Sequence, residues 1–148
     1  MRIGFIGLGT MGGAASLNLI RGGHQLTVCD LDLKRATKHL ELGAKWADTP
    51  SEAAKDVDIV FTMVFGPKQI EQIIRGENGL LHSMGPGQVW VDLTTNQPEL
   101  ARELAEEIID TGAIAIDAPV TGAVDGARNG NMTQFAGGDK ETIERIRP

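Results

Sequence analysis

A glycine pattern directly after the first apolar segment constrains the fold of this chain more than any other feature. Residues 2–6 form a short apolar run, and Gly7, Gly9 and Gly12 follow at the spacing G-x-G-x-x-G. In a strand–turn–helix unit the first glycine permits a tight turn, the second leaves room for a ligand, and the third lets the helix approach the strand. The helical pattern continues to about residue 20. The free amides and the dipole of such a helix N-terminus attract a phosphate.

An acidic residue at the end of the next apolar run makes this pattern more specific. The run 25–29 is followed by Asp30, eighteen positions after Gly12. In dinucleotide-binding units a carboxylate near this position accepts hydrogen bonds from the adenosine ribose. We therefore predict a dinucleotide-binding site. We expect NAD rather than NADP, because Asp30 would repel the 2′-phosphate of NADP, although Lys34 and Arg35 would soften this repulsion.

Strand-like and helical segments alternate along the rest of the chain. Further strands are predicted near residues 45–46, 58–65, 88–93, 113–117 and 132–136, and further helices are predicted to begin at Asp32, Thr49, Pro67, Asn96 and Asp139. The alternation predicts an α/β fold, a doubly wound and mainly parallel Rossmann-type sheet with helices on both faces. We expect residues 1–148 to form one dinucleotide-binding domain, in which the strand at 132–136 lacks neighbours.

Composition argues against several other classes of function. The net charge of −6, without a local Lys/Arg cluster, disfavours nucleic acid and anionic membranes as partners. The longest apolar run, residues 57–65, is too short to span a bilayer. The single cysteine, Cys29, excludes an intrachain disulfide, and a strand from residue 2 leaves no room for a targeting peptide, so we expect a cytoplasmic protein. His24, His39 and His82 are scattered, and we expect no metal site.

Two motifs together resemble the β-hydroxyacid dehydrogenase family, which includes 3-hydroxyisobutyrate dehydrogenase and tartronate semialdehyde reductase. Residues 5–19 fit its opening signature, including Ser16 and Asn18, and residues 117–123 (Asp-Ala-Pro-Val-Thr-Gly-Ala) are similar to its substrate-loop motif. The resemblance covers the whole chain but only the N-terminal half of a family member. It implies that the chain is truncated before the interdomain helix and that the family's all-helical C-terminal domain is absent from it.

The resemblance also implies which residues contact the cofactor. They lie in the glycine turn, after the second and fourth strands, and at two later polar positions: Gly7, Leu8, Gly9, Thr10, Met11, Gly12, Asp30, Val64, Phe65, Gln69 and Thr95. Family members usually have Leu-Pro at positions 64–65 and asparagine at position 69. The residues alone are also compatible with a plain strand exit at Thr95.

The substrate loop implied by the resemblance consists of Thr121, Gly122 and Ala123. A hydroxyl beside sparsely shielded backbone amides can bind a carboxylate, although a glycine-rich surface turn is the alternative reading of the same residues. Ala123 replaces a more common glycine, which would narrow or shift the pocket. Asp92 and Asp117 end buried strands, where we expect them to accept local amide hydrogen bonds rather than act in acid–base chemistry.

The function implied by the resemblance is NAD-dependent hydride transfer between a nicotinamide and a small 3-hydroxy acid of the 3-hydroxyisobutyrate type. The family uses a lysine beyond the substrate loop as general base, and no residue after Lys140 fills this role. We therefore expect no catalytic residue here, and a full-length protein that forms a homo-oligomer. An imine reductase-like NAD(P)H enzyme and a non-catalytic dinucleotide-binding scaffold remain as alternatives.

Overall fold

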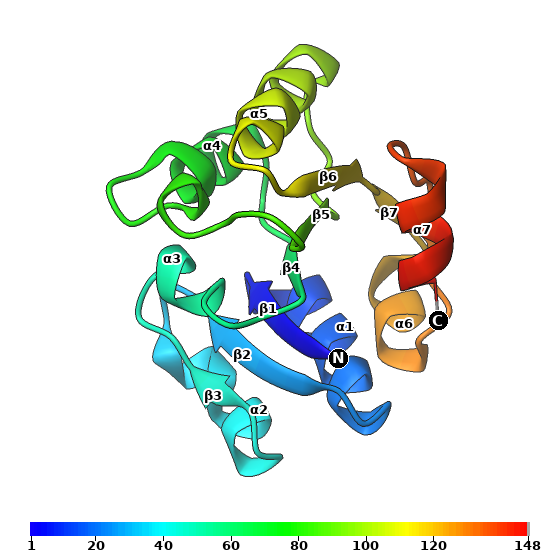
Figure 1. Cartoon of the computed structure of the whole chain (residues 1–148). Helices are drawn as coiled ribbons and strands as arrows, with labels where there is room; N and C mark the ends of the chain where they lie inside the picture. The colour runs from blue at the N-terminus through cyan, green and yellow to red at the C-terminus, as the bar shows by residue number, and fades with distance from the viewer. Residues whose placement is uncertain (148) are drawn as a thin grey trace.

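A six-stranded parallel sheet lies between two layers of helices in the computed structural model, which describes residues 1–147 (Figure 1). The strand order is β3-β2-β1-β4-β5-β6, and every neighbouring pair is parallel. The strands are β1 (Arg2–Ile6), β2 (Gln25–Cys29), β3 (Lys45–Trp46), β4 (Ile59–Thr62), β5 (Val89–Asp92) and β6 (Ile114–Asp117). The order reverses between β1 and β4, where ligands of such sheets bind. The predicted doubly wound α/β fold is confirmed.

The helices begin largely where the local sequence predicts. They are α1 (Thr10–Arg21), η1 (Leu33–Ala36), α2 (Thr37–Glu41), α3 (Pro50–Ala53), α4 (Pro67–Arg75), η2 (Leu80–His82), α5 (Pro98–Asp110), α6 (Ala123–Asn129) and α7 (Lys140–Ile146). Asp32, Thr49 and Asp139 each cap a helix through a side-chain oxygen that accepts a backbone amide. The predicted start at Asn96 is wrong, because α5 begins at Pro98, whose ring favours the first helical position. None of the helices within residues 1–147 is long and apolar enough to cross a membrane.

Two apolar cores lie on the two faces of the sheet. One combines Val60 and Trp90 with the inward side chains of α4 and α5, including Ile74 and Leu104. The other lies on the face covered by α1, and it includes Phe5. Because both faces are buried, the central strands are apolar at nearly every position rather than at alternate ones. This explains why the sequence shows continuous runs such as 58–65.

The predicted strand at 132–136 is shorter than expected and belongs to a different sheet. Only Thr133–Gln134 form β8, which pairs antiparallel with β7 (Val120–Thr121) in a separate two-stranded sheet. The strand therefore has a neighbour, contrary to the expectation. Residues 133 and 134 are both exposed, so they have no apolar face with which to join the buried parallel sheet.

Candidate dinucleotide-binding site

Two of the three glycines in the first turn are required by the fold itself. Gly7 has φ +98°, and a Cβ there would collide with the backbone carbonyl of Met63, the residue that follows β4. A Cβ on Gly12 would overlap the carbonyl oxygen of Gly7. Any side chain at these two positions would push α1 away from the sheet, as expected for the turn and packing glycines of this motif.

Gly9 differs from both, because nothing in the described chain requires a glycine at this position. Its backbone is extended, with φ −63° and ψ −171°, a conformation open to any residue. A Cβ there would meet only a guanidinium nitrogen of Arg35, 3.9 Å away. The space belongs to a shallow groove of about 340 Å³ lined by Leu8, Gly9, Thr10 and Arg35. Because Gly9 has no side chain, this groove stays open.

The N-terminus of α1 faces this groove without a cap of its own. Gly9 is the N-cap residue, no side chain within residues 1–147 accepts from the first-turn amides, and the first turn contains no acidic residue. The first amides of a helix have no intrahelical partner, and together with the dipole they favour an anion. The residues present therefore fit the diphosphate of a dinucleotide.

Asp30 has a structural role that the sequence did not reveal. Its Oδ2 accepts a hydrogen bond from the Leu8 amide (2.6 Å), and its Oδ1 accepts one from the Asp32 amide (3.0 Å). The carboxylate thus ties the glycine turn to the end of β2, and its side chain is 8% exposed. Each carboxylate oxygen accepts about two hydrogen bonds, so Asp30 retains capacity for ribose hydroxyls.

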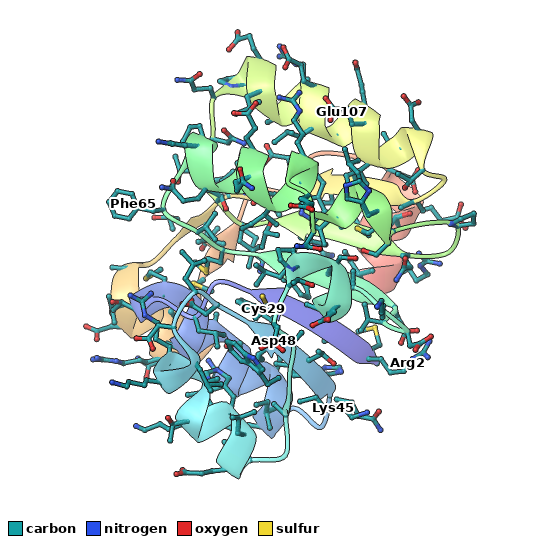
Figure 2. All side chains as sticks on the ribbon, turned by 90° about the vertical axis from the view of Figure 1, so that its left-hand side faces the viewer. Arg2, Cys29, Lys45, Asp48, Phe65 and Glu107 are labelled. Atoms are coloured by element: carbon teal, nitrogen blue, oxygen red, sulfur yellow. The ribbon has the colours of Figure 1, made fainter. Side chains whose placement is uncertain are left out.

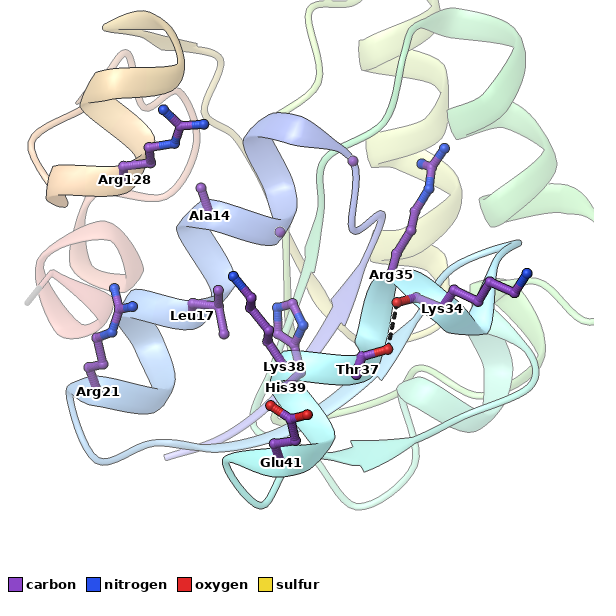
Figure 3. Close-up of a pocket in the computed structure, with 12 residues that line it drawn as sticks. Ala14, Leu17, Arg21, Lys34, Arg35, Thr37, Lys38, His39, Glu41 and Arg128 are labelled. Carbon is purple, nitrogen blue, oxygen red and sulfur yellow. Dashed lines mark hydrogen bonds between the residues drawn. The ribbon is translucent and has the colours of Figure 1, made fainter.

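A second, larger groove makes this corner of an acidic protein locally positive. It measures about 640 Å³ and runs along the outer side of α1, between α2 and α6 (Figure 3). Five cations and one acid line it: Arg21, Lys34, Arg35, Lys38 and Arg128, with Glu41. Arg35 also lines the smaller groove and lies 3.8 Å from the Asp30 carboxylate. The repulsion that Asp30 exerts on a phosphate is therefore partly offset.

His39, expected to be a scattered histidine, is buried in the wall of this larger groove. The Ser16 hydroxyl donates to the Gly12 carbonyl (2.7 Å) and lies 2.8 Å from Nε2 of His39. The hydroxyl and the imidazole therefore share a hydrogen bond, and which of the two groups donates depends on the tautomer of the ring. Burial lowers the pKa of His39, so the ring is neutral near pH 7. The pair fastens α1 to α2.

The ends of β4 and β5 bring the later predicted contacts to the same edge of the sheet. Thr62 is in register with Ile6 on one side and with Asp92 on the other. Val64 and Phe65 therefore leave β4 between the glycine turn and Thr95, while the side chains of Gln69 and Thr95 are exposed. Phe65 is 98% exposed and points away from the domain (Figure 2).

The predicted substrate loop lies elsewhere, at the start of α6. Thr121, Gly122 and Ala123 are all exposed. Gly122 has φ +124°, and Ala123 has φ +52°, in the left-handed region that favours glycine. Asn18, part of the opening signature, explains how α6 is held: its Nδ2 donates to the Ala127 carbonyl (2.7 Å), across 109 positions of sequence.

Comparison with known proteins agrees with this geometry. Residues 2–148 match the family described as the NAD binding domain of 6-phosphogluconate dehydrogenase. The chain belongs to this family. It is 37% identical to the Escherichia coli 2-hydroxy-3-oxopropionate reductase over 148 residues, which are 100% of this chain and 50% of that protein. The chain is thus an NAD(P)-binding Rossmann domain, and its resemblance to the hydroxyacid dehydrogenases is confirmed.

Solved structures support the same relationship. The Mycobacterium tuberculosis 3-hydroxyisobutyrate dehydrogenase with L-serine superposes with a TM-score of 0.91 at 31% identity, covering 99% of this chain and 50% of that one. Psf3 in complex with NADP+ and 2-OPP gives 0.93 at 31% identity, covering 99% and 52%. A Streptomyces aurantiacus imine reductase, at 24% identity and a TM-score of 0.85 over 98% and 50%, shares the fold. The chain spans about half the length of the curated relatives it matches.

Proposed function

We propose that this chain is the NAD-binding part of an oxidoreductase that transfers a hydride between a nicotinamide and a small 3-hydroxy acid. The open space at Gly9 carries this proposal. The fold requires a glycine at the other two positions of the motif, but it does not require one at position 9. A glycine kept where a side chain would fit indicates a ligand that lies against the backbone.

A dinucleotide would extend along the carboxyl edge of β2, β1, β4 and β5. Its diphosphate would lie at the N-terminus of α1, with an adenosine ribose hydroxyl donating to Asp30. Leu31 and Phe65 follow β2 and β4, and both side chains are almost fully exposed; such apolar groups are suited to contact an adenine ring. Thr95 would lie beside the nicotinamide, which supplies the hydride acceptor when it is bound.

We propose a preference for NAD over NADP, based on the Asp30 carboxylate. A 2′-phosphate about 3 Å from it would lose on the order of 1–3 kcal/mol once partly desolvated, and Arg35 reduces this loss. Calorimetric titration of the chain with each cofactor tests the preference. Equal or tighter binding of NADP would contradict it.

The substrate carboxylate would bind at Thr121, Gly122 and Ala123, where a hydroxyl lies next to first-turn amides of α6 that have no intrahelical partner. The general base would lie beyond residue 148, so the chain by itself would bind cofactor without turnover. We expect the full-length protein to be a cytoplasmic homo-oligomer. The named relatives, a 2-hydroxy-3-oxopropionate reductase and 3-hydroxyisobutyrate dehydrogenases, support a small hydroxy acid as substrate.

The imine reductase alternative rests on neighbours such as the Streptomyces aurantiacus enzyme. The segment 117–123 favours the hydroxyacid dehydrogenase, because imine reductases do not usually carry it. Determining the residue at the base position of the complete protein discriminates among the alternatives. A lysine supports the proposal, an aspartate supports the imine reductase, and an inert residue supports a non-catalytic scaffold.

A further inference from the structure

A buried carboxyl group lies at the end of β5, behind the edge where the dinucleotide is proposed to bind. Asp92 is 2% exposed. Its Oδ1 accepts a hydrogen bond from the Thr62 hydroxyl of β4 (2.8 Å), and Thr62 in turn accepts one from Nε1 of Trp90 (3.0 Å). Trp90 thus donates to Thr62, and Thr62 donates to Asp92. These two hydrogen bonds link β4 to β5.

The same oxygen also holds the segment that leaves β5. The Thr94 amide donates to Oδ1 of Asp92 (3.0 Å), and the buried Thr94 hydroxyl accepts from the Val64 amide (3.2 Å). One carboxylate oxygen is thus bound to the last residue of β4 and, through Thr94, to the backbone that leaves β4. The segments it connects, Val64–Phe65 and Thr94–Thr95, contain three of the proposed cofactor contacts.

Each hydrogen bond recorded at the Asp92 carboxyl is donated to it, and within residues 1–147 its Oδ2 has no partner. A carboxylate accepts hydrogen bonds, whereas a protonated carboxyl must also donate one. Burial and, to a lesser extent, the charge of Asp117 on β6 raise the pKa of Asp92 to about 6, and hydrogen bonds from Thr94 and Thr62 oppose the shift. Burying a carboxylate lowers the stability of the fold. Packing therefore does not explain why an aspartate occupies this buried position.

We propose that Asp92 is a positioning residue for the cofactor: its ionised carboxylate holds the exits of β4 and β5 at the spacing that a bound dinucleotide requires. This inference rests on the proposed function, because the two exits are cofactor contacts only if the chain binds a dinucleotide. It goes beyond a strand-end role, in which Asp92 would serve only the fold.

Cofactor binding and folding stability then respond to pH in opposite directions. Binding requires the ionised carboxylate, so affinity falls as the pH falls below about 6. The pKa is higher in the folded chain than the ordinary value of 3.8, so the folded state binds more protons between these two values. The contribution of Asp92 to the free energy of unfolding is therefore greatest at low pH and is lost as the pH rises through this window.

The test is calorimetric titration of the chain with NAD between pH 5 and pH 8, using the wild type and Asp92→Asn. The wild type should bind at least about fivefold more weakly at pH 5 than at pH 7.5, the lower end of typical coupling between sites. The Asp92→Asn variant should bind more weakly at pH 7.5 by a similar factor, with a flatter pH profile and an undiminished Tm. Thr94→Val should also weaken binding, whereas Thr94→Ser, which keeps the hydroxyl, should retain it.

Trp90 supplies a readout that needs no cofactor. In a Trp46→Phe background Trp90 is the only tryptophan, and its emission should titrate near pH 6, whereas adding Asp92→Asn to this background should abolish the titration.

Equal affinity and pH profiles in wild type and Asp92→Asn would overturn the positioning role and leave the proposed function intact. A lower Tm at pH 7.5 in Asp92→Asn would show that Asp92 serves the fold, and would also overturn it. If the wild type binds no NAD at any pH, the proposed function fails and the positioning role fails with it.

Discussion

The glycine turn and the substrate loop are both glycine-containing connections that lead into a helix, but the structure supports them very differently. The turn leaves the central strand β1, and the Leu8 amide is bound to Asp30. The loop begins at Thr121, the last residue of the two-residue strand β7; its residues are exposed, and Ala123 has a left-handed backbone. The turn is therefore held by contacts within the described residues, whereas the loop is exposed and has an unfavourable backbone conformation.

The largest expected effect concerns catalysis, for which the proposed substrate loop is needed. We predict that the chain binds NAD but does not turn over small 3-hydroxy acids, because no general base is identified in it. A missing base costs about 10²–10⁴ in rate, and the loss of orientation by a second wall adds to this. Absorbance of the reduced cofactor, followed for the chain beside the full-length protein, measures the difference. Turnover within tenfold of the full-length protein would show that the base lies inside these residues.

The second prediction tests the glycine turn. Gly9→Val should lower NAD affinity at least about tenfold and shift the Tm by only a few degrees, because the backbone at Gly9 accepts a side chain. Gly85→Val is the matched control, since a Cβ there also has open space and lies before β5, at the opposite edge of the sheet. Gly12→Val should instead unfold the chain. Unchanged NAD affinity in Gly9→Val would mean that the turn holds no dinucleotide.

The third prediction concerns the charge beside the turn. Asp30→Asn keeps one oxygen that can accept from the Leu8 amide, loses the acceptor of the Asp32 amide and removes the negative charge. The ratio of NAD to NADP affinity should therefore fall by about fivefold or more. Arg35→Ala should raise the ratio, since Arg35 lies 3.8 Å from the carboxylate. Calorimetry with both cofactors measures each ratio, and Lys45→Ala, on β3, changes the net charge by the same amount as Arg35→Ala and controls for that variant. A ratio that Asp30→Asn leaves unchanged would assign the preference to other groups.

The smallest expected effect concerns the backbone of the substrate loop at Ala123. Ala123→Gly should relieve backbone strain and stabilise the chain by about 0.5–1 kcal/mol, or about 1–4 °C in Tm. Ala105→Gly, inside α5, should destabilise it by a similar amount, because glycine is unfavourable in a helix. Thermal unfolding followed by circular dichroism measures both. A lower Tm for Ala123→Gly would show that the loop backbone carries no strain.

The sequence alone determined the features that depend on neighbouring residues. The glycine pattern predicted β1, the turn and α1, and the caps at Asp32, Thr49 and Asp139 act within three positions of the residues whose amides they accept. Continuous apolar runs predicted strands buried on both faces. These features follow from backbone sterics and side-chain periodicity, which operate over one or two turns of chain.

Only the tertiary structure decided which distant groups meet. Asp30 accepts from Leu8 because β1 and β2 are adjacent, Asn18 reaches Ala127 because α6 packs on α1, and Asp92 meets Thr62 because β4 and β5 pair in that register. The separate pairing of β8 with β7 likewise depends on how the chain leaves β6. Periodicity shows that a strand is buried but not which strand lies beside it, because strand order is set by the packing of the whole sheet.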